Sequence, residues 1–220
     1  MSTLDAIEIE TGPQPRASVI WLHGLGADGN DFVPIVEELA LPAAPIRFVF
    51  PHAPMIPVTI NNGYVMRAWY DIFSADLVRR EDAAGVRASQ VQVEALIARE
   101  RARGTPQSRI VLAGFSQGGA IALQTGLRQA DPLAGIMALS TYLPLADTLA
   151  AERAPESAPV PIFYAHGSDD PVVPIERAER SRATLDALGY RVEWHTYRMP
   201  HSVCMEEIAA IGEWLGRVLA

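Results

Sequence analysis

The sequence predicts an α/β fold in which helices cover both faces of a mostly parallel central sheet. Short runs of β-branched and aromatic residues alternate with longer segments of helical periodicity along the 220 residues, as expected when helices connect parallel strands. A chain of this length can bury roughly 70% of the surface that its unfolded form exposes. No repeat and no low-complexity linker divides it, so we expect one domain over residues 1–220 without a separate cap domain.

Six segments form the predicted sheet. Four of them are apolar at almost every position within residues 18–22, 47–50, 110–115 and 136–139, as strands buried on both faces are. The segment Leu4–Glu10 alternates apolar and polar residues, which is the pattern of an additional edge strand. The six predicted strands are Ala17–Leu22, Ile46–Phe50, Ile110–Phe115, Gly135–Leu139, Pro161–His166 and Val192–Tyr197.

Helices are predicted between the strands, and two of the connections are unusually long. Pro51–Asp82 and Ser140–Pro159 exceed the usual handful of residues, and loops of this length in a compact domain are commonly functional. The first is too apolar for a purely solvated loop, so we expect these connections to supply the walls or the lid of a site. The predicted helices are Asp31–Leu39, Ala83–Arg103, Gln117–Gln129, Pro174–Leu188 and Ser202–Leu219.

Composition excludes several classes of protein. The chain has 18 Lys and Arg against 26 Asp and Glu, a formal net charge of −8, which argues against a nucleic-acid-binding protein. Cys204 is the only cysteine, so no intrachain disulfide can form, and no Cys/His cluster has zinc spacing. The sequence shows neither a signal peptide nor an apolar stretch of the roughly 18 residues that span a membrane. We therefore expect a cytoplasmic protein without integral membrane association.

A G-x-S-x-G motif at Gly114–Gly118 is the strongest local signal of chemistry. It follows an apolar run and precedes a helical one, which is the context of a nucleophile elbow. Such a strand-to-helix turn is too tight for side chains at its two glycines, and it holds Ser116 with its hydroxyl exposed above the sheet. The motif therefore predicts Ser116 as a nucleophile.

A serine nucleophile needs a histidine base and a carboxylate that orients the base. In this type of fold the chain order is Ser, acid, His. The loop after the strand 161–166 offers both Asp169 and Asp170, and the spacing leaves the choice between them open. Of the five histidines, His201 is favoured because it lies in the loop between the last strand and the last helix.

The tetrahedral intermediate of acyl transfer also needs two donors for its oxyanion. The backbone N–H of Gln117, directly after the serine, is expected to be one of them. The glycine-rich loop His23–Gly29 follows an early strand, and we select the N–H of Leu25 there as the second. No Walker lysine follows these glycines, so a nucleotide site is not expected.

Taken together, these motifs resemble the carboxylesterase and acyl-protein thioesterase family of small α/β-hydrolases. The resemblance implies that Asp170, the fifth residue of the H-G-x-x-D pattern, is the catalytic acid, and that Leu25 and Gln117 form the oxyanion hole. It disfavours the dienelactone hydrolases, which carry cysteine at the elbow. The matching segments are Leu22–Gly29, Pro51–Pro54, Ala68–Asp71, Gly114–Gly119, His166–Val173 and Pro200–His201.

The resemblance implies a serine esterase that hydrolyses carboxylic esters of short to medium acyl chains, and acyl thioesters as well, through Ser116, Asp170 and His201. Neither a metal nor an organic cofactor is required. Alternatives are a main activity as lysophospholipase or acyl-protein thioesterase, and a catalytically silent binding module. A peptidase is disfavoured because a gating domain is absent, and the sequence leaves open whether the chain forms a homodimer. Residues nominated to line the acyl pocket are Leu25, Trp69, Ile72, Leu143 and Val172.

Overall fold

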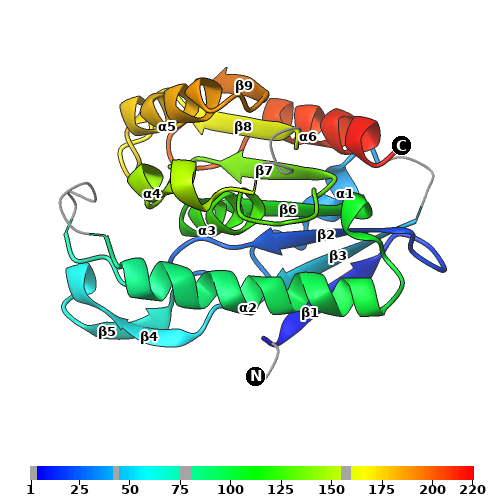
Figure 1. Ribbon diagram of the computed structural model, residues 1–220, viewed down its shortest axis with the longest axis horizontal. Helices are drawn as coiled ribbons and strands as arrows, with labels where there is room; N and C mark the ends of the chain where they lie inside the picture. The colour runs from blue at the N-terminus through cyan, green and yellow to red at the C-terminus, as the bar shows by residue number, and fades with distance from the viewer. Residues whose placement is uncertain (1–3, 42–44, 75–80, 155–159) are drawn as a thin grey trace.

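A computed structural model describes residues 4–41, 45–74, 81–154 and 160–220. One seven-stranded sheet forms its centre, with the strand order β1-β3-β2-β6-β7-β8-β9 (Figure 1). The edge strand β1 is antiparallel to β3, and the remaining neighbours in the sheet are parallel. The strands are β1 (Ala6–Glu10), β2 (Ala17–Leu22), β3 (Ile46–Pro51), β6 (Ile110–Phe115), β7 (Gly135–Leu139), β8 (Ile162–Gly167) and β9 (Val192–Tyr197).

Helices cover both faces of this sheet and give each face a hydrophobic core of its own. Side chains of α2, α3, α4 and α5 belong to one core, and those of α1 and α6 belong to the other. The fold class predicted from the sequence is thus confirmed, and no cap domain stands apart within the described residues. The helices are α1 (Ile35–Glu38), α2 (Ala83–Ala102), α3 (Gln117–Gly126), α4 (Ala146–Glu152), α5 (Ile175–Ala187) and α6 (Met205–Val218).

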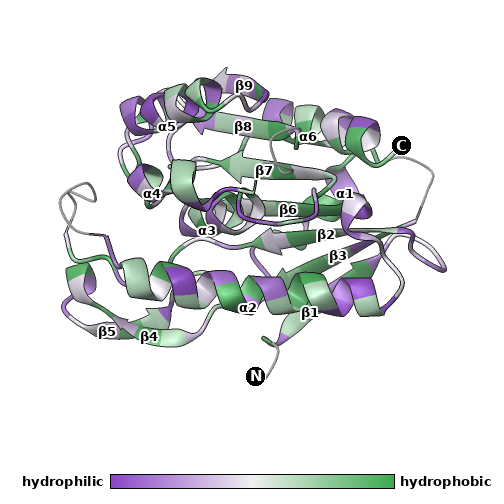
Figure 2. Cartoon of the chain, in the orientation of Figure 1, coloured by the Kyte–Doolittle hydropathy of each residue, from purple (hydrophilic) through white to green (hydrophobic). Residues whose placement is uncertain are grey.

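Hydropathy explains the placing of the strands. The central strands are coloured as hydrophobic along most of their length, whereas α2 and α5 mix both colours (Figure 2). Every residue of β2, β3, β7 and β8 is buried, as strands covered by helices on both faces must be. The edge strand β9 alternates half-buried and exposed positions along most of its length.

One buried polar cluster lies at the amino ends of the parallel strands, centred on Glu100 of α2. Its carboxylate accepts hydrogen bonds from Ser18 Oγ at 2.7 Å, from Arg47 at 2.9 Å and from Arg103 at 3.1 Å. A buried carboxylate is stable only when such partners compensate for its lost hydration. The cluster therefore fastens the end of α2 to β2 and β3.

Both long connections contain secondary structure that the sequence analysis did not predict. Within Pro51–Asp82, strands β4 (Met55–Val58) and β5 (Tyr64–Arg67) form an antiparallel hairpin around the 3-10 helix η1 (Thr59–Asn61). Within Ser140–Pro159 lies the helix α4. Residues 75–80 and 155–159 of these connections lie outside the described residues.

Some helix boundaries also differ from the predicted ones. The segment predicted as a helix over Asp31–Leu39 contains only the four residues of α1, because turns with hydrogen bonds over three residues precede it, such as Asp31 N to Asp28 O. The last helix begins at Met205, after Pro200 and a bend at His201 and Ser202.

Candidate active site

The turn between β6 and α3 places Ser116 in a conformation that few residues other than glycine adopt. Ser116 has φ 53° and ψ −120°, and such strain is concentrated at functional sites. A Cβ atom at Gly114 would lie 2.3 Å from the carbonyl of Gly118, and one at Gly118 would lie 2.3 Å from Leu22 O. Only glycine fits at either position, so the two glycines let the elbow pack directly on β2.

Hydrogen bonds from the neighbouring strand hold this elbow in place. Ser116 N donates to Leu139 O at 2.8 Å, and Thr141 Oγ1 donates to Ser116 O at 2.6 Å. The side chain of Gln117 binds a third segment, since it accepts from Trp69 N at 2.8 Å and donates to Tyr70 O at 2.7 Å. The elbow is therefore tied to β7 and to the segment that follows the hairpin.

Asp170 and His201 come together from the loops after β8 and β9. His201 Nδ1 lies 2.6 Å from Asp170 Oδ2, while Asp170 Oδ1 accepts hydrogen bonds from Val172 N at 2.8 Å and Val173 N at 2.9 Å. Because these bonds fix the carboxylate as an acceptor, His201 Nδ1 is the donor and Nε2 is left to accept a proton.

The alternative acid, Asp169, is exposed. Its backbone N–H donates to Met199 O at 3.2 Å, and the neighbouring Ser168 N donates to Tyr197 O at 2.8 Å. These bonds latch the loop of Asp170 to the loop of His201. The structure thus pairs Asp170, and not Asp169, with the histidine.

The ring of His201 lies against the nucleophile elbow. Its centroid is 4.7 Å from that of Phe115, the residue before Ser116. No hydrogen bond joins Ser116 Oγ to His201 among the described residues, and such bonds are often long until a substrate is bound. The three residues nominated as a triad therefore gather at the carboxyl edge of the sheet, where open α/β sheets bind ligands.

Two of the other histidines are buried and have structural roles. His23 Nε2 accepts from Ala53 N at 3.0 Å, so Nδ1 carries the hydrogen and donates to Gly24 O at 2.7 Å. His166 Nε2 lies 2.8 Å from Val173 O. Burial lowers the pKa of both His23 and His166, so both side chains are neutral connectors between loops.

The remaining two histidines make contacts away from the elbow. His52 Nδ1 accepts from Gly29 N at 3.0 Å. His195 lies 3.1 Å from the carboxylate of Glu193 on the same strand. Neither one meets Asp170. Buried His166 has its Nε2 3.5 Å from Asp170 Oδ2, but only His201, at 2.6 Å, also packs its ring on the elbow of Ser116.

The two nominated oxyanion donors border the same cavity as the serine. Leu25, Ser116 and Gln117 are all among its lining residues. Gly24 approaches the serine so closely that a Cβ there would lie 3.5 Å from Ser116 Cβ. The N–H of Gln117 is the first of α3, and helix-starting N–H groups have no partner within their own helix, so it is free to bind an anion.

The cavity at the serine has a volume of about 320 Å³ and is formed by loops from several parts of the chain. Of the residues nominated as acyl-pocket lining, Ile72 and Val172 are found there with Leu25. Apart from these three, Ser116 and Gln117, the lining residues were not foreseen, although Tyr70 stands beside Trp69 in a motif that pointed to this region. The complete lining is Leu25, Ile60, Asn61, Tyr70, Ile72, Ser116, Gln117, Tyr142, Val172 and Val173.

Trp69 and Leu143 were nominated as lining but lie elsewhere. The buried indole of Trp69 donates to His23 O at 2.9 Å, so it supports the loop that carries Leu25 from behind. Leu143 lines a second cavity beside α5. Both assignments are therefore corrected: Trp69 supports the site from outside the cavity, and Leu143 lines the cavity beside α5.

Comparison with known protein families shows a match over nearly the whole chain. The model of the phospholipase/carboxylesterase family matches residues 4–219. The chain belongs to that family. It is accordingly a hydrolase with the α/β-hydrolase fold, and the family predicted from the sequence is confirmed.

Individual members of the phospholipase/carboxylesterase family agree with this. Acyl-protein thioesterase 1 of Mycosarcoma maydis is 42% identical over 238 residues, which cover 100% of this chain and 99% of that protein. Acyl-protein thioesterase 1 of Neurospora crassa is 44% identical, over 90% of this chain and 85% of that protein. The crystal structure of Arabidopsis thaliana SOBER1 covers 93% of this chain and 100% of its own, at 32% identity and a TM-score of 0.88. That of Zea mays acyl-protein thioesterase 2 covers 98% and 100%, at 29% identity and a TM-score of 0.85.

None of the helices in the described part of the chain combines the length and the hydropathy needed to cross a membrane. Within residues 4–41, 45–74, 81–154 and 160–220, no three His, Cys, Asp or Glu side chains are grouped so that they could hold a metal ion.

Proposed function

We propose that this hydrolase cleaves carboxylic esters and acyl thioesters with Ser116 as nucleophile, His201 as general base and Asp170 as the residue that orients the base. The observation that carries the proposal is the 2.6 Å contact between Asp170 and His201, with the ring of His201 packed on the elbow of Ser116. A strained serine, a base and an orienting acid on three separate loops are the parts that acyl transfer to serine needs.

The reaction runs in two halves. Ser116 Oγ attacks the acyl carbonyl while His201 Nε2 takes the hydroxyl proton, and the N–H groups of Leu25 and Gln117 stabilise the oxyanion. His201 then donates its proton to the leaving alcohol or thiol, and the acyl group remains on Ser116. A water molecule, deprotonated by His201, attacks the acyl-enzyme, and the proton returns to Ser116 Oγ as the acid departs.

The substrate class follows from the cavity and from the relatives. Ligand cavities span roughly 300 to 1,000 Å³, so a volume of about 320 Å³ suits a small acyl group. Its lining is mostly apolar, as an acyl chain requires, and the names of the fungal relatives support thioesters as substrates. The single cysteine, Cys204, supports action in the cytoplasm on a small acyl ester or thioester.

Covalent labelling tests the nucleophile directly. A fluorophosphonate probe is expected to label the wild-type protein and not Ser116→Ala, whose turnover of a p-nitrophenyl ester falls by roughly 10⁴ to 10⁶-fold. Ser108→Ala is the matched control, because Ser108 is exposed in the 3-10 helix η2 (Gln107–Arg109), which leads into the amino end of β6. Labelling of Ser116→Ala at the wild-type rate would reject the assignment.

Rates on matched substrates test the scope of the reaction. For an oxyester and a thioester with the same acyl group, we expect turnover of both, since the acyl-enzyme is identical in the two cases. A protein that labels with the probe but hydrolyses neither would be a catalytically silent member of the fold.

A further inference from the structure

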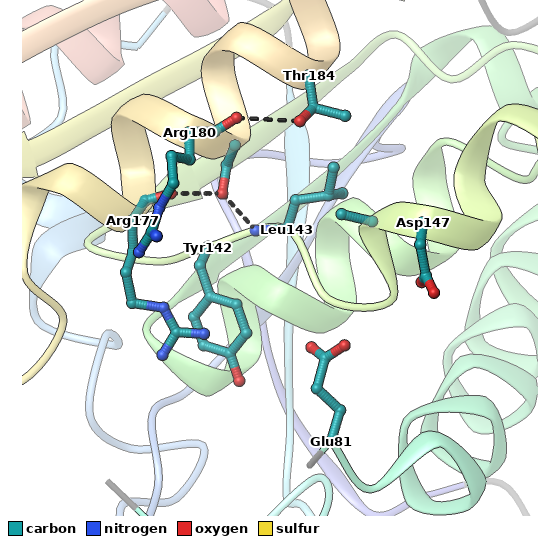
Figure 3. Close-up of a pocket in the computed structure, with 9 residues that line it drawn as sticks. Glu81, Tyr142, Leu143, Asp147, Arg177, Arg180 and Thr184 are labelled. Atoms are coloured by element: carbon teal, nitrogen blue, oxygen red, sulfur yellow. Dashed lines mark hydrogen bonds between the residues drawn. The ribbon is translucent and has the colours of Figure 1, made fainter. Parts of the chain in front are cut away.

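A second cavity lies beside the first, and Tyr142 separates the two. The second cavity has a volume of about 350 Å³ and lies against α5 (Figure 3). Within the described residues, Tyr142 is the one residue that lines both cavities. The residues around the second cavity are Glu81, Tyr142, Leu143, Ala146, Asp147, Arg177, Arg180, Ser181 and Thr184.

Burial shows which end of the serine cavity Tyr142 occupies. Ile60 and Val172 are 40% and 60% exposed, so they stand at the mouth. Tyr70 and Tyr142 are 3% and 5% exposed, as deeply buried as Gln117 and Val173 at 3% each, and these four residues form the buried end. An acyl chain that enters past the mouth and reacts at the serine extends toward this pair of tyrosines.

Contacts on several sides fix the ring of Tyr142. Its hydroxyl is 2.8 Å from that of Tyr70, and the Arg177 guanidinium covers its ring at 4.1 Å from the centroid, an arrangement visible in Figure 3. Tyr164 Oη donates at 2.8 Å to the carbonyl of Thr141, the residue that precedes Tyr142. These contacts hold the ring of Tyr142 in one position, so it forms a fixed wall between the two cavities.

The backbone that follows Tyr142 is also anchored. The second cavity, on the far side of the ring, is more highly charged than the cavity at the serine. Leu143 N donates to Ser181 Oγ at 2.8 Å. Beyond the ring stand charged side chains, Arg177 and Arg180 on α5 facing Glu81 and Asp147. An apolar chain gains nothing from such surroundings, so the wall also keeps these charges away from the acyl group.

We propose, building on the function proposed above, that Tyr142 sets the upper limit of acyl-chain length by closing the acyl cavity against the charged cavity beside α5. The ring is the limiting element, because it occupies the volume that further methylenes would need. Removing it opens this volume first and joins the two cavities behind it.

The experiment measures kcat/KM for p-nitrophenyl esters from two to about sixteen carbons. For the wild type, kcat/KM rises by up to about fourfold per methylene until the chain reaches Tyr142, and then stops rising. In Tyr142→Ala and Tyr142→Leu the rise continues to longer chains. Tyr142→Phe keeps the ring and therefore keeps the wild-type limit, although it loses the hydroxyl contact.

Thr184→Ala is the matched control, because it enlarges the charged cavity without opening the wall and so keeps the wild-type limit. If Tyr142→Ala does not fold, Tyr142→Leu decides. An unchanged limit in the folded variants that lack the ring would overturn this inference, as would a limit in Tyr142→Phe shifted as far as in Tyr142→Leu. A wild-type protein that hydrolyses none of the esters would instead overturn the proposed function itself.

Discussion

The two ends of the parallel sheet each bury a carboxylate, and the two are held in opposite ways. At the carboxyl end, Asp170 accepts two backbone N–H groups and faces His201. At the amino end, Glu100 is 0% exposed and faces Arg47 and Arg103. Arginine does not release its proton in proteins, whereas histidine exchanges one near neutral pH. The ion pairs at the amino end therefore keep their charges, whereas the pair at the carboxyl end can exchange a proton, as the proposed mechanism requires.

The largest expected effect is the loss of activity on substitution of Asp170 at the carboxyl end. Asp170→Asn is expected to lower kcat/KM by about 10⁴-fold, because the amide cannot hold His201 in the required tautomer, while the protein stays folded. Asp169→Asn is the control, since Asp169 is exposed and makes no contact with the histidine ring. Steady-state ester hydrolysis measures both, and equal losses in the two variants would contradict the pairing described here.

At the amino end we expect the opposite: stability falls while activity is kept. Glu100→Ala removes one of the two carboxylates that pair with the buried Arg47, Glu10 being the other, and should cost about 3 kcal/mol of unfolding free energy, while kcat of the folded protein is unaltered. Urea denaturation gives the stability, and Glu179→Gln on the exposed side of α5 should stay within about 0.5 kcal/mol of the wild type. A drop in kcat as large as that of Asp170→Asn would erase the distinction between the two ends.

A third buried carboxylate, Glu207 in the first turn of α6, has no charged partner among the described residues and should make the stability of the protein depend on pH. Burial raises the pKa of Glu207 to about 8, so the folded protein holds a proton there that the unfolded chain releases above its ordinary value near 4.5. Stability from this group is present at low pH and is lost as pH rises toward 8. Between pH 6 and 8 the loss is about 2 kcal/mol.

Glu207→Gln isolates this effect. Unfolding free energies of the wild type and the variant are compared across pH, because buried His23 and His166, whose pKa values are lowered, add a loss of stability in the opposite direction below about pH 6.5. Both proteins share that acid-side loss, so it cancels in the difference. A difference that does not change between pH 6 and 8 would refute the raised pKa.

The smallest expected effect concerns two buried threonines, one at each end. Thr141→Val removes the hydrogen bond to Ser116 O and should cost about 1 kcal/mol, with a several-fold loss of kcat as the elbow relaxes. Thr105 at the amino end is the matched position, because its Oγ1 has only a 3.4 Å contact with Ser18. Thr105→Val should leave kcat unchanged, and equal effects on kcat would show that the elbow does not depend on this bond.

The sequence predicted the sheet well, and the three residues that it nominated as a triad lie at one edge of that sheet, because both depend on local patterns. Continuous apolar runs mark buried strands, and the G-x-S-x-G motif requires its glycines for steric reasons that the structure repeats at Gly114 and Gly118. The choice between Asp169 and Asp170 was different in kind. Their side chains point in different directions from one turn, and no spacing rule distinguishes them, so the resemblance alone favoured Asp170 before the geometry did.

The hairpin β4–β5 was missed although a signal for it was present. Asn62 and Gly63 both have positive φ, and Asn-Gly between apolar runs is a strong hairpin signal. Pro57 in the first strand obscured it, because proline within a run argues against a strand. Trp69 and Leu143 were misplaced for another reason: an apolar residue in a loop can face the cavity at the serine, a neighbouring cavity or the core, and composition does not say which.

The latch between the loops of Asp170 and His201 has a consequence for divergence within the family. Because Asp169 N and Ser168 N are bonded to the backbone of the β9 loop, an insertion in either loop would displace acid and base together. The hairpin β4–β5, whose connection supplies Ile60 and Asn61 to the cavity mouth, carries none of the three residues of the proposed triad. The cavity mouth can therefore be reshaped by altering the hairpin without moving Asp170 or His201.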